Sequence, residues 1–192
     1  MCIRDSIYEL VLRDLRLRYR GTIFGWAWTI LNPLLFMAIY TLVFSTYLRL
    51  KIPHYPLFLL SGLLPWTWLS GAVTQGTSAI LDGRMYVGKT TFPTEVLVAI
   101  PVLSHAVNFL FSLPILLVFA FLLKVHIGAS LVVLPLIAFI ELLIIFALVL
   151  LTATLNVFYR DLQQLVTHAL MAVFFLTPVS YTHLTLPTIL RV

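Results

Sequence analysis

Charged residues are scarce in this sequence of 192 residues, of which only 10% are Asp, Glu, Lys or Arg. Ordinary globular chains carry about a quarter. Hydrophobic residues make up 61%, and a soluble domain of this size could not cover so much apolar surface. The composition argues against a soluble enzyme, a disordered chain and a nucleic-acid-binding protein. It indicates a protein whose solvent is a lipid bilayer.

Cysteine and the usual groupings of catalytic side chains are also missing. Cys2 is the sole cysteine, so no internal disulfide can form. The net charge is +5, but the basic residues stand at the edges of apolar blocks and form no patch for nucleic acid. No two histidines have metal-ligand spacing, and the sequence contains no recognisable nucleophile–base pair or paired carboxylates. We therefore predict no metal site and no catalytic site in this chain.

Long uncharged stretches dominate what is present. They are 21–48, 52–81, 96–123, 125–159 with Glu141 alone inside it, and 162–190. Each is long enough for one helical crossing of the hydrocarbon core, which needs about 20 residues, and too short for two. Barrel strands are excluded because the stretches lack alternation. The sequence predicts an all-α integral membrane protein with about five spans, at about 23–48, 57–81, 96–123, 130–155 and 162–178.

The basic residues of the connections predict the orientation, because cytoplasmic loops are enriched in Lys and Arg. With the N-terminus in the cytoplasm, the inside bases are Arg4, Arg13, Arg16, Arg18, Arg20, Arg84, Lys89 and Arg160. The outside bases are then Arg49, Lys51 and Lys124. We therefore expect a multi-pass protein of the cytoplasmic (inner) membrane whose N-terminus is cytoplasmic.

Residues 7–20 predict an amphipathic helix that lies at the membrane surface. At helical spacing, Glu9, Arg13, Arg16 and Arg20 share one narrow face, and apolar residues cover a wide opposite arc. Asp14 and Arg18 are four residues apart and can pair. Such a helix lies in the headgroup plane, where anionic lipid holds its arginines. It can serve as a topology anchor or as a docking surface for a cytoplasmic partner.

The two ends of the sequence differ in character from the rest. Residues 1–6 and 179–192 resemble translated sequencing-adaptor sequence, and Pro187 with several threonines fits a membrane span poorly. We expect these segments to be non-native and leave them out of the fold prediction. The expected organisation is an interfacial helix at 7–20 and a transmembrane domain at 21–178.

One short motif has the fixed positions of a phosphate-binding loop. Gly83, Gly88, Lys89 and Thr90 fit G-x-x-x-x-G-K-[ST], in which backbone amides and the lysine hold phosphates. That chemistry requires a strand before the loop and a helix after it. Here the motif occupies a 14-residue connection, 82–95, between two expected spans. The sequence therefore favours a basic cytoplasmic loop over a nucleotide site.

Glu141 is the one acid inside an expected span. A carboxylate near the bilayer centre costs a few kcal/mol, so it should face the bundle interior or a wet cavity. A hydrogen-bonded acid in a helix interface is the favoured interpretation, and a proton relay is the alternative. His105 and Asn108 are candidate partners for it.

Several aromatic residues stand in or near the expected spans. Most tryptophans and tyrosines of membrane proteins belong to belts at the two interfaces. Aromatic faces also suit sugar rings, so a carbohydrate-lined pathway is the second interpretation. The candidates for such a pathway are Trp26, Trp28, Tyr40, Trp66 and Trp68.

Three ordered motifs resemble a known family, the permeases of polysaccharide-export ABC transporters, which are type-2 exporters of O-antigen, capsule and teichoic acid. The motifs are RDLRLRYR at 13–20 with GWAW at 25–28 and LNPL at 31–34, KTTFPTE at 89–95, and NVFYRD at 156–161 with LTP at 176–178. Thr94 departs from the family, which usually has a basic residue there. The likeness stops at Pro178, before the family's sixth span and outer gate, so we expect a fragment.

The resemblance implies a normally six-helix permease that moves lipid-linked polysaccharide or teichoic acid. Two copies would form a homodimeric pore in membrane lipid, above two separate ATP-binding subunits. ATP and magnesium would be held by those subunits, with no cofactor in this chain. The implied contacts with the ATP-binding subunits are the interfacial helix (Arg13, Asp14, Arg16, Arg18, Arg20), a coupling loop (Arg84, Tyr86, Lys89, Phe92, Pro93, Glu95) and a second cytoplasmic loop (Asn156, Tyr159, Arg160, Asp161).

Other functions remain open at this point. The nearest is a type-2 exporter of another cargo, such as a drug or a lipid. An intramembrane enzyme acting on lipid-linked sugars, using Glu141 and a histidine, would show turnover without ATP. A non-catalytic membrane scaffold would show neither transport nor turnover.

Overall fold

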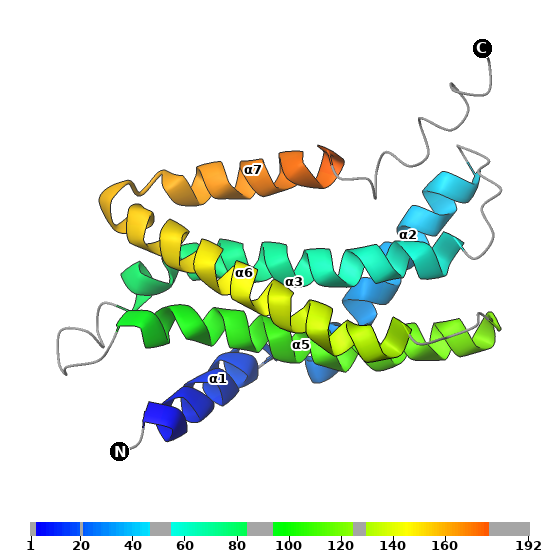
Figure 1. Cartoon of the computed structure of the whole chain (residues 1–192), viewed down its shortest axis with the longest axis horizontal. Helices are drawn as coiled ribbons and strands as arrows, with labels where there is room; N and C mark the ends of the chain where they lie inside the picture. The colour runs from blue at the N-terminus through cyan, green and yellow to red at the C-terminus, as the bar shows by residue number, and fades with distance from the viewer. Residues whose placement is uncertain (1–2, 20, 47–54, 84–93, 125–129, 177–192) are drawn as a thin grey trace, which may run out of the picture.

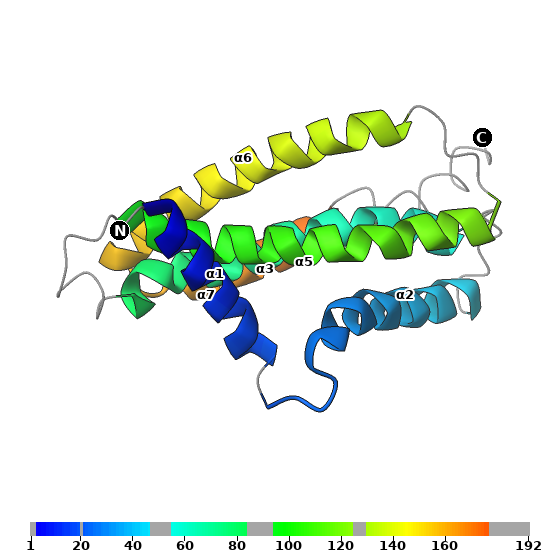
Figure 2. The ribbon, with the colours of Figure 1, turned by 90° about the horizontal axis from the view of Figure 1, so that it is seen from below.

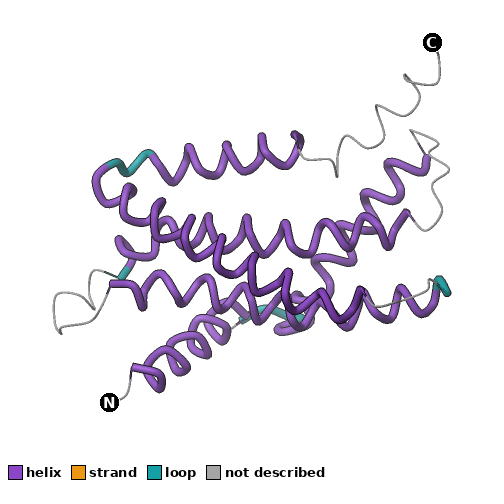
Figure 3. Tube along the Cα trace, in the orientation of Figure 1, coloured by secondary structure: helices purple, strands orange, loops and turns teal. Residues whose placement is uncertain are grey.

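The computed structural model describes residues 3–19, 21–46, 55–83, 94–124 and 130–176, and within these ranges the chain is helical with no strand. The α-helices are α1 (Ile3–Tyr19), α2 (Trp28–Thr46), α3 (Tyr55–Asp82), α5 (Thr94–Leu122), α6 (Ser130–Phe158) and α7 (Leu162–Leu176) (Figures 1 and 3). A short 3-10 helix, η1 (Gly25–Ala27), precedes α2. The all-α prediction is therefore confirmed.

Three long helices form the centre of the bundle. Helices α3, α5 and α6 run side by side, and α3 packs against both of the others (Figures 1 and 2). Their shared core contains mainly aliphatic side chains with two aromatic rings, namely Leu60, Leu64, Trp68, Ala72, Val73, Val98, Val102, Phe109, Ile145, Val149 and Ala153. These are also the three helices in the described ranges that are long and apolar enough to cross a bilayer. Three of the five uncharged stretches, 52–81, 96–123 and 125–159, thus correspond to the helices that make the core.

The first expected span was placed too early. It was expected to begin at residue 23, but the chain is not helical at 21–24, and α2 begins at Trp28. Gly21 and Gly25 have φ angles of 81° and 49°, a region that glycine enters without steric cost. The apolar parts described for α2 and α7, Trp28–Ile39 and Leu162–Leu176, are shorter than a full crossing.

Helix α1 lies obliquely across the side of α5, outside the three-helix centre (Figure 2). Its apolar arc provides this contact, because Val11 and Leu15 are buried while Glu9, Arg13 and Arg16 are exposed. The start of α1, the end of α3, the start of α5 and the turn from α6 into α7 all lie at one end of the bundle (Figure 1). That end is therefore where the expected cytoplasmic segments meet.

Close packing between α3 and the neighbouring helices depends on two glycines. A Cβ added at Gly76 would overlap Val149 on α6, with Cγ2 at 3.1 Å and Cγ1 closer still. A Cβ at Gly71 would overlap the His105 ring on α5, 2.7 Å from Nδ1. Small residues allow helix backbones to approach closely in membranes, where packing drives association.

We expect Gly76→Ala to destabilise the bundle by about 1–3 kcal/mol, the usual cost of an extra methyl in a packed core. Val149 cannot turn away easily because its β-branched side chain has one strongly preferred rotamer in a helix. Thermal unfolding in detergent would measure the loss. The double variant Gly76→Ala, Val149→Ala should recover much of it by making room, and an unchanged melting temperature in the single variant would contradict this packing.

Candidate functional site

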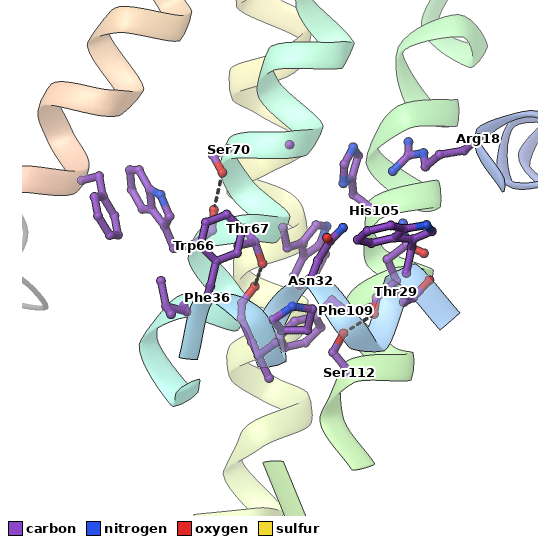
Figure 4. Close-up of a pocket in the computed structure, with 18 of the residues that line it drawn as sticks. Arg18, Thr29, Asn32, Phe36, Trp66, Thr67, Ser70, His105, Phe109 and Ser112 are labelled. Carbon is purple, nitrogen blue, oxygen red and sulfur yellow. Dashed lines mark hydrogen bonds between the residues drawn. The ribbon is translucent and has the colours of Figure 1, made fainter. Parts of the chain in front are cut away.

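A half-open cavity of about 780 Å³ lies beside the core, where α2 begins (Figure 4). The middle turns of α3 and α5, the first turns of α2, the end of α1 and Phe174 of α7 enclose it. Its lining combines aromatic rings with amides and hydroxyls, and comprises Arg18, Thr22, Trp28, Thr29, Asn32, Pro33, Phe36, Leu63, Leu64, Trp66, Thr67, Trp68, Ser70, Gly71, His105, Asn108, Phe109, Ser112 and Phe174. It is the best candidate for a binding site in the described part of the chain.

Three of the five aromatic candidates line this cavity, namely Trp28, Trp66 and Trp68. Trp68 is buried, with 4% of its surface exposed, and stacks on Phe109 with ring centroids 4.8 Å apart. Trp66 is only partly buried, and its ring lies 5.4 Å from that of Phe174. The side chains of Trp26 and Tyr40 lie outside what the structure describes. Trp68 is therefore a buried part of the cavity wall, and Trp66 is a more exposed part of it.

Hydroxyl groups around the cavity bond to their own helices. Thr67 donates to the Leu64 carbonyl at 2.9 Å, and Ser70 donates to the Trp66 carbonyl at 2.8 Å. Ser112 donates to the Asn108 carbonyl at 2.9 Å. Each donor is thus occupied while the hydroxyl oxygen keeps its acceptor lone pairs. Together with Asn32, these groups suit a ligand that has both hydroxyls and apolar faces.

A polar network joins α1 to the bundle at the edge of the cavity. We call Asp14, Arg18, Gln75 and His105 the Arg18 network. Arg18 Nη2 donates to Asp14 Oδ2 at 3.3 Å and to Gln75 Oε1 at 2.5 Å. Gln75 Nε2 donates to Asp14 Oδ1 at 3.3 Å, and His105 Nε2 lies 3.1 Å from Gln75 Oε1. The expected pairing of Asp14 with Arg18 is confirmed, and it extends across three helices.

The donor and acceptor types of the groups in the Arg18 network determine where its hydrogen atoms lie. A guanidinium only donates and an ionised carboxylate only accepts, so Gln75 must turn its oxygen to Arg18 and its amide nitrogen to Asp14. His105 must then donate from Nε2, because Gln75 Oε1 can only accept. Its ring fits against α3 because Gly71 has no side chain there.

Glu141 does not belong to this network. It is partly buried on the face of α6 that also carries Ile145 and Val149, and it has no hydrogen-bond partner among the described residues. His105, one of its two candidate partners, bonds to Gln75 instead. Asn108, the other, lines the cavity. The expected position toward other helices agrees with the partial burial, but the expected hydrogen bond is absent in the described ranges.

Asn156 was expected in a cytoplasmic loop, and this was wrong. It lies within α6 with 1% of its surface exposed, and its Nδ2 donates to the Thr77 carbonyl of α3 at 3.0 Å. Thr77 also donates to Thr152 Oγ1 at 3.0 Å, so a small polar cluster joins the two helices. Tyr159, Arg160 and Asp161 are exposed in the connection to α7. Helix α6 was expected to end at residue 155, but it continues to Phe158.

We expect Asn156→Leu to destabilise the protein by about 0.5–2 kcal/mol, the range of hydrogen bonds between membrane helices. The reason is the lost bond from α6 to the Thr77 carbonyl, which no water replaces at a buried site. Urea or thermal unfolding in detergent would report the change. Thr154→Ala is the matched control, because Thr154 is exposed two residues away and bonds only within α6. Equal stability of the two variants would argue against a structural role for Asn156.

The expected coupling loop lies mostly outside the described residues. Five of its residues lie outside the described ranges, namely Arg84, Tyr86, Lys89, Phe92 and Pro93. The sixth, Glu95, is exposed in the first turn of α5. The described chain on both sides of the phosphate-loop motif is long helix, with no strand in 55–83 or 94–124. Gly83 has a packing explanation, because a Cβ there would lie 2.5 Å from Leu97 Cδ1. The structural context that a phosphate loop needs is thus missing from these ranges.

Several site residues were not anticipated from the sequence. Gly71 and Phe109 line the cavity, Gln75 bonds to Arg18 at its edge, and Asn32 appeared in the sequence only as part of a motif. A signal for Gln75 did exist, since an amide inside an apolar helix is costly to leave without a partner. Nothing local in the sequence identifies the partner, which is 61 residues away at Asp14 and 57 away at Arg18.

Comparison with known proteins places the chain in a family. The sequence profile described as ABC-2 type transporter matches residues 5–192. The chain is 41% identical over 178 residues to an O-antigen export system permease protein RfbA of Myxococcus xanthus, covering 93% of this chain and 68% of the relative. Two proteins of the same name from Klebsiella pneumoniae are 34% and 33% identical over 178 residues, covering 92% of this chain and 69% of each relative. This chain therefore belongs to the ABC-2 type transporters as a multi-pass membrane permease subunit, which implies an ATP-binding partner subunit.

Proposed function

We propose that this permease exports a lipid-linked polysaccharide of the O-antigen class across the cytoplasmic membrane, driven by ATP hydrolysis in its partner subunit. The observation that carries the proposal is the 780 Å³ cavity, whose walls alternate tryptophan and phenylalanine rings with amides and hydroxyls. Sugar rings have apolar faces and polar edges, and such a lining offers partners for both. The relatives from Myxococcus and Klebsiella, named as O-antigen export permeases, support the same cargo.

A drug or simple lipid exporter is the nearest alternative, because the cavity lining is mainly apolar and would also suit such a cargo. Drug-sized ligands favour pockets that are mainly hydrophobic with few polar groups. This cavity contains two asparagines, Asn32 and Asn108, and several hydroxyl side chains beside its aromatic rings. A polyhydroxylated cargo forms hydrogen bonds with more of these polar groups than an apolar cargo does.

The proposed orientation has the N-terminus in the cytoplasm of a cell with the permease in its inner membrane. Eight basic residues fall on connections assigned to the cytoplasm, against three outside. The start of α1, the start of α5 and the connection between α6 and α7, which carries the exposed residues 159–161, lie at one end of the bundle (Figure 1). We assign this end to the ATP-binding subunit, which holds ATP and magnesium.

A second copy of the permease would complete the pathway. One chain encloses the cavity only on some sides, so a homodimer in membrane lipid can close the open side into a pore. Closed symmetric dimers are the commonest assemblies of identical subunits. ATP-driven closure of the partner subunits would then move the permeases relative to each other and drive the glycan outward.

Export can be tested in cells that make an O-antigen polysaccharide but lack their own permease and ATP-binding subunit. Expression of this permease together with its own ATP-binding subunit should restore surface polysaccharide, detected by antibody on intact cells. Replacement of the phosphate-loop lysine in the ATP-binding subunit should abolish the surface signal and leave polysaccharide inside. ATP-dependent efflux of a dye or phospholipid without polysaccharide export would show that the cargo assignment is wrong.

A further inference from the structure

The edge of the cavity nearest α1 differs in charge from the rest. Arg18 is the one residue with a permanent charge in the described lining, which contains no carboxylate. Asp14, the partner of Arg18, does not line the cavity. The cavity therefore faces the cation of this ion pair, and the anion lies behind it. In a setting with little water, such a charge acts more strongly than it would in solution.

Arg18 also has N–H groups that are not used in the Arg18 network. Both of its hydrogen bonds in the described ranges come from Nη2, one to Asp14 and one to Gln75. Nη1 and Nε donate to no described residue, so the two N–H groups of Nη1 and the one of Nε remain available. Both parallel pairs of guanidinium N–H groups include Nη2, so the available groups donate separate charge-assisted hydrogen bonds to phosphate oxygens. Gln75 and Asp14 hold the remaining nitrogen, so the group is fixed in place before any ligand arrives.

A second donor lies at the same edge. Figure 4 shows Arg18 from α1 and His105 from α5 pointing toward one another, with Asn32 from α2 below them. His105 already donates its Nε2 proton to Gln75, so the donors available to a tetrahedral oxyanion are Arg18 and the amide of Asn32. The aromatic rings of Trp66, Trp68 and Phe109 line other parts of the same cavity.

We propose that Arg18, assisted by Asn32, forms an anion subsite for the phosphate ester of an amphiphilic lipid whose other part enters the aromatic cavity. The proposal rests on the proposed function, since it assigns to this edge the charged group of the exported lipid. Two kinds of molecule could supply this phosphate ester. One is a phosphorylated lipid that carries the cargo, and the other is an ordinary membrane phospholipid with its headgroup.

Binding can be measured on the permease complexed with its ATP-binding subunit in phosphatidylcholine nanodiscs. The probe is dodecyl phosphate, titrated against the tryptophan emission of Trp28, Trp66 and Trp68, with dodecanol as the uncharged comparison. The wild type should bind dodecyl phosphate at least about tenfold more tightly than dodecanol, the effect of one charged hydrogen-bonded contact. Equal affinity for the two probes would overturn the proposal.

Variants separate the anion subsite from the docking of α1. Arg18→Gln should remove the preference for phosphate, and Arg18→Lys should keep part of it. Lys124→Gln, at an exposed base that follows α5 and does not line the cavity, should behave as wild type. Gln75→Leu breaks the link to α3 but leaves the cation, so it should retain a clear preference. If Gln75→Leu loses the preference as completely as Arg18→Gln, then helix docking and not phosphate binding explains the effect, and the proposal fails.

The two sources are distinguished by the composition of the disc. If phosphatidylglycerol in the nanodisc displaces dodecyl phosphate, the subsite takes ordinary anionic headgroups. If it does not, and inorganic phosphate also fails to compete, the site selects a phosphorylated amphiphile that can reach the cavity. Both results support the subsite. Because the readout is binding, it stands apart from export, and loss of polysaccharide export in cells would count against the proposed cargo alone.

Discussion

Replacing Trp66 with alanine should lower the rate of polysaccharide export about tenfold, while the partner subunit continues to hydrolyse ATP. One aromatic contact contributes about 0.5–1.5 kcal/mol beyond burial, and 1.4 kcal/mol corresponds to a tenfold change in rate. Trp66 lines the cavity and is only partly buried, so its ring is available to a passing glycan. Export would be followed by surface labelling and hydrolysis by phosphate release, both in reconstituted vesicles.

Two comparison variants show whether the Trp66 effect is specific. Trp68→Ala should unfold or strongly destabilise the bundle, by about 3–5 kcal/mol, because Trp68 is buried and stacks on Phe109. Phe121→Ala removes an aromatic ring from α5 that is 81% exposed and does not line the cavity, so export should be unchanged. Equal export by the Trp66 and Phe121 variants would remove Trp66 from the proposed pathway.

Charge reversal at Glu95 should abolish most of the ATP-driven export by preventing productive docking of the partner subunit. Glu95 is exposed in the first turn of α5, at the end of the bundle assigned to the cytoplasm. Its favourable interaction with the helix dipole is worth only about 0.3–1 kcal/mol, so Glu95→Lys should leave the fold intact. Buried interfacial charge pairs cost about 2–5 kcal/mol when one partner is truncated, which predicts a large loss of association. Co-purification of the two subunits in detergent is the direct measurement.

Lys124→Glu is the matched control for Glu95→Lys, since Lys124 follows the other end of the same helix and is also exposed. It should leave association with the ATP-binding subunit unchanged. The pair therefore tests orientation as well as docking. Loss of association in the Lys124 variant, with normal association in the Glu95 variant, would mean that the chain crosses the membrane in the opposite direction.

Local patterns in the sequence are sufficient for the helices and for one ion pair. The uncharged stretches predict α3, α5 and α6 because lipid forces the backbone to satisfy its own hydrogen bonds. Asp14 and Arg18 pair as expected because residues four apart are neighbours on any helix. The sequence analysis did not predict the late start of α2. Gly21 and Gly25 precede that helix, but a glycine delays a helix only where the backbone turns, and the turn is seen only in the structure.

Membership of a permease family could also be inferred from the sequence, because short motifs in a fixed order can be recognised without knowing how the helices pack. The sequence could not show which residues meet across helices. Asn156 belongs to one of those motifs, yet its position inside α6 against Thr77 gives it a structural contact that no motif reveals.

The amino-acid sequence by itself determined that this chain is helical and lies in a membrane, because hydrophobicity and charge act at every residue independently of its distant neighbours. Only the tertiary structure decided that Trp28, Trp66 and Trp68 share one cavity, and that Gln75 links Arg18 to His105. The hydrogen bonds of Gln75 with Arg18 and His105 join residues 57 and 30 positions apart. They depend on how far each helix slides and turns against the next, and that is set by side-chain packing at positions such as Gly71 and Gly76.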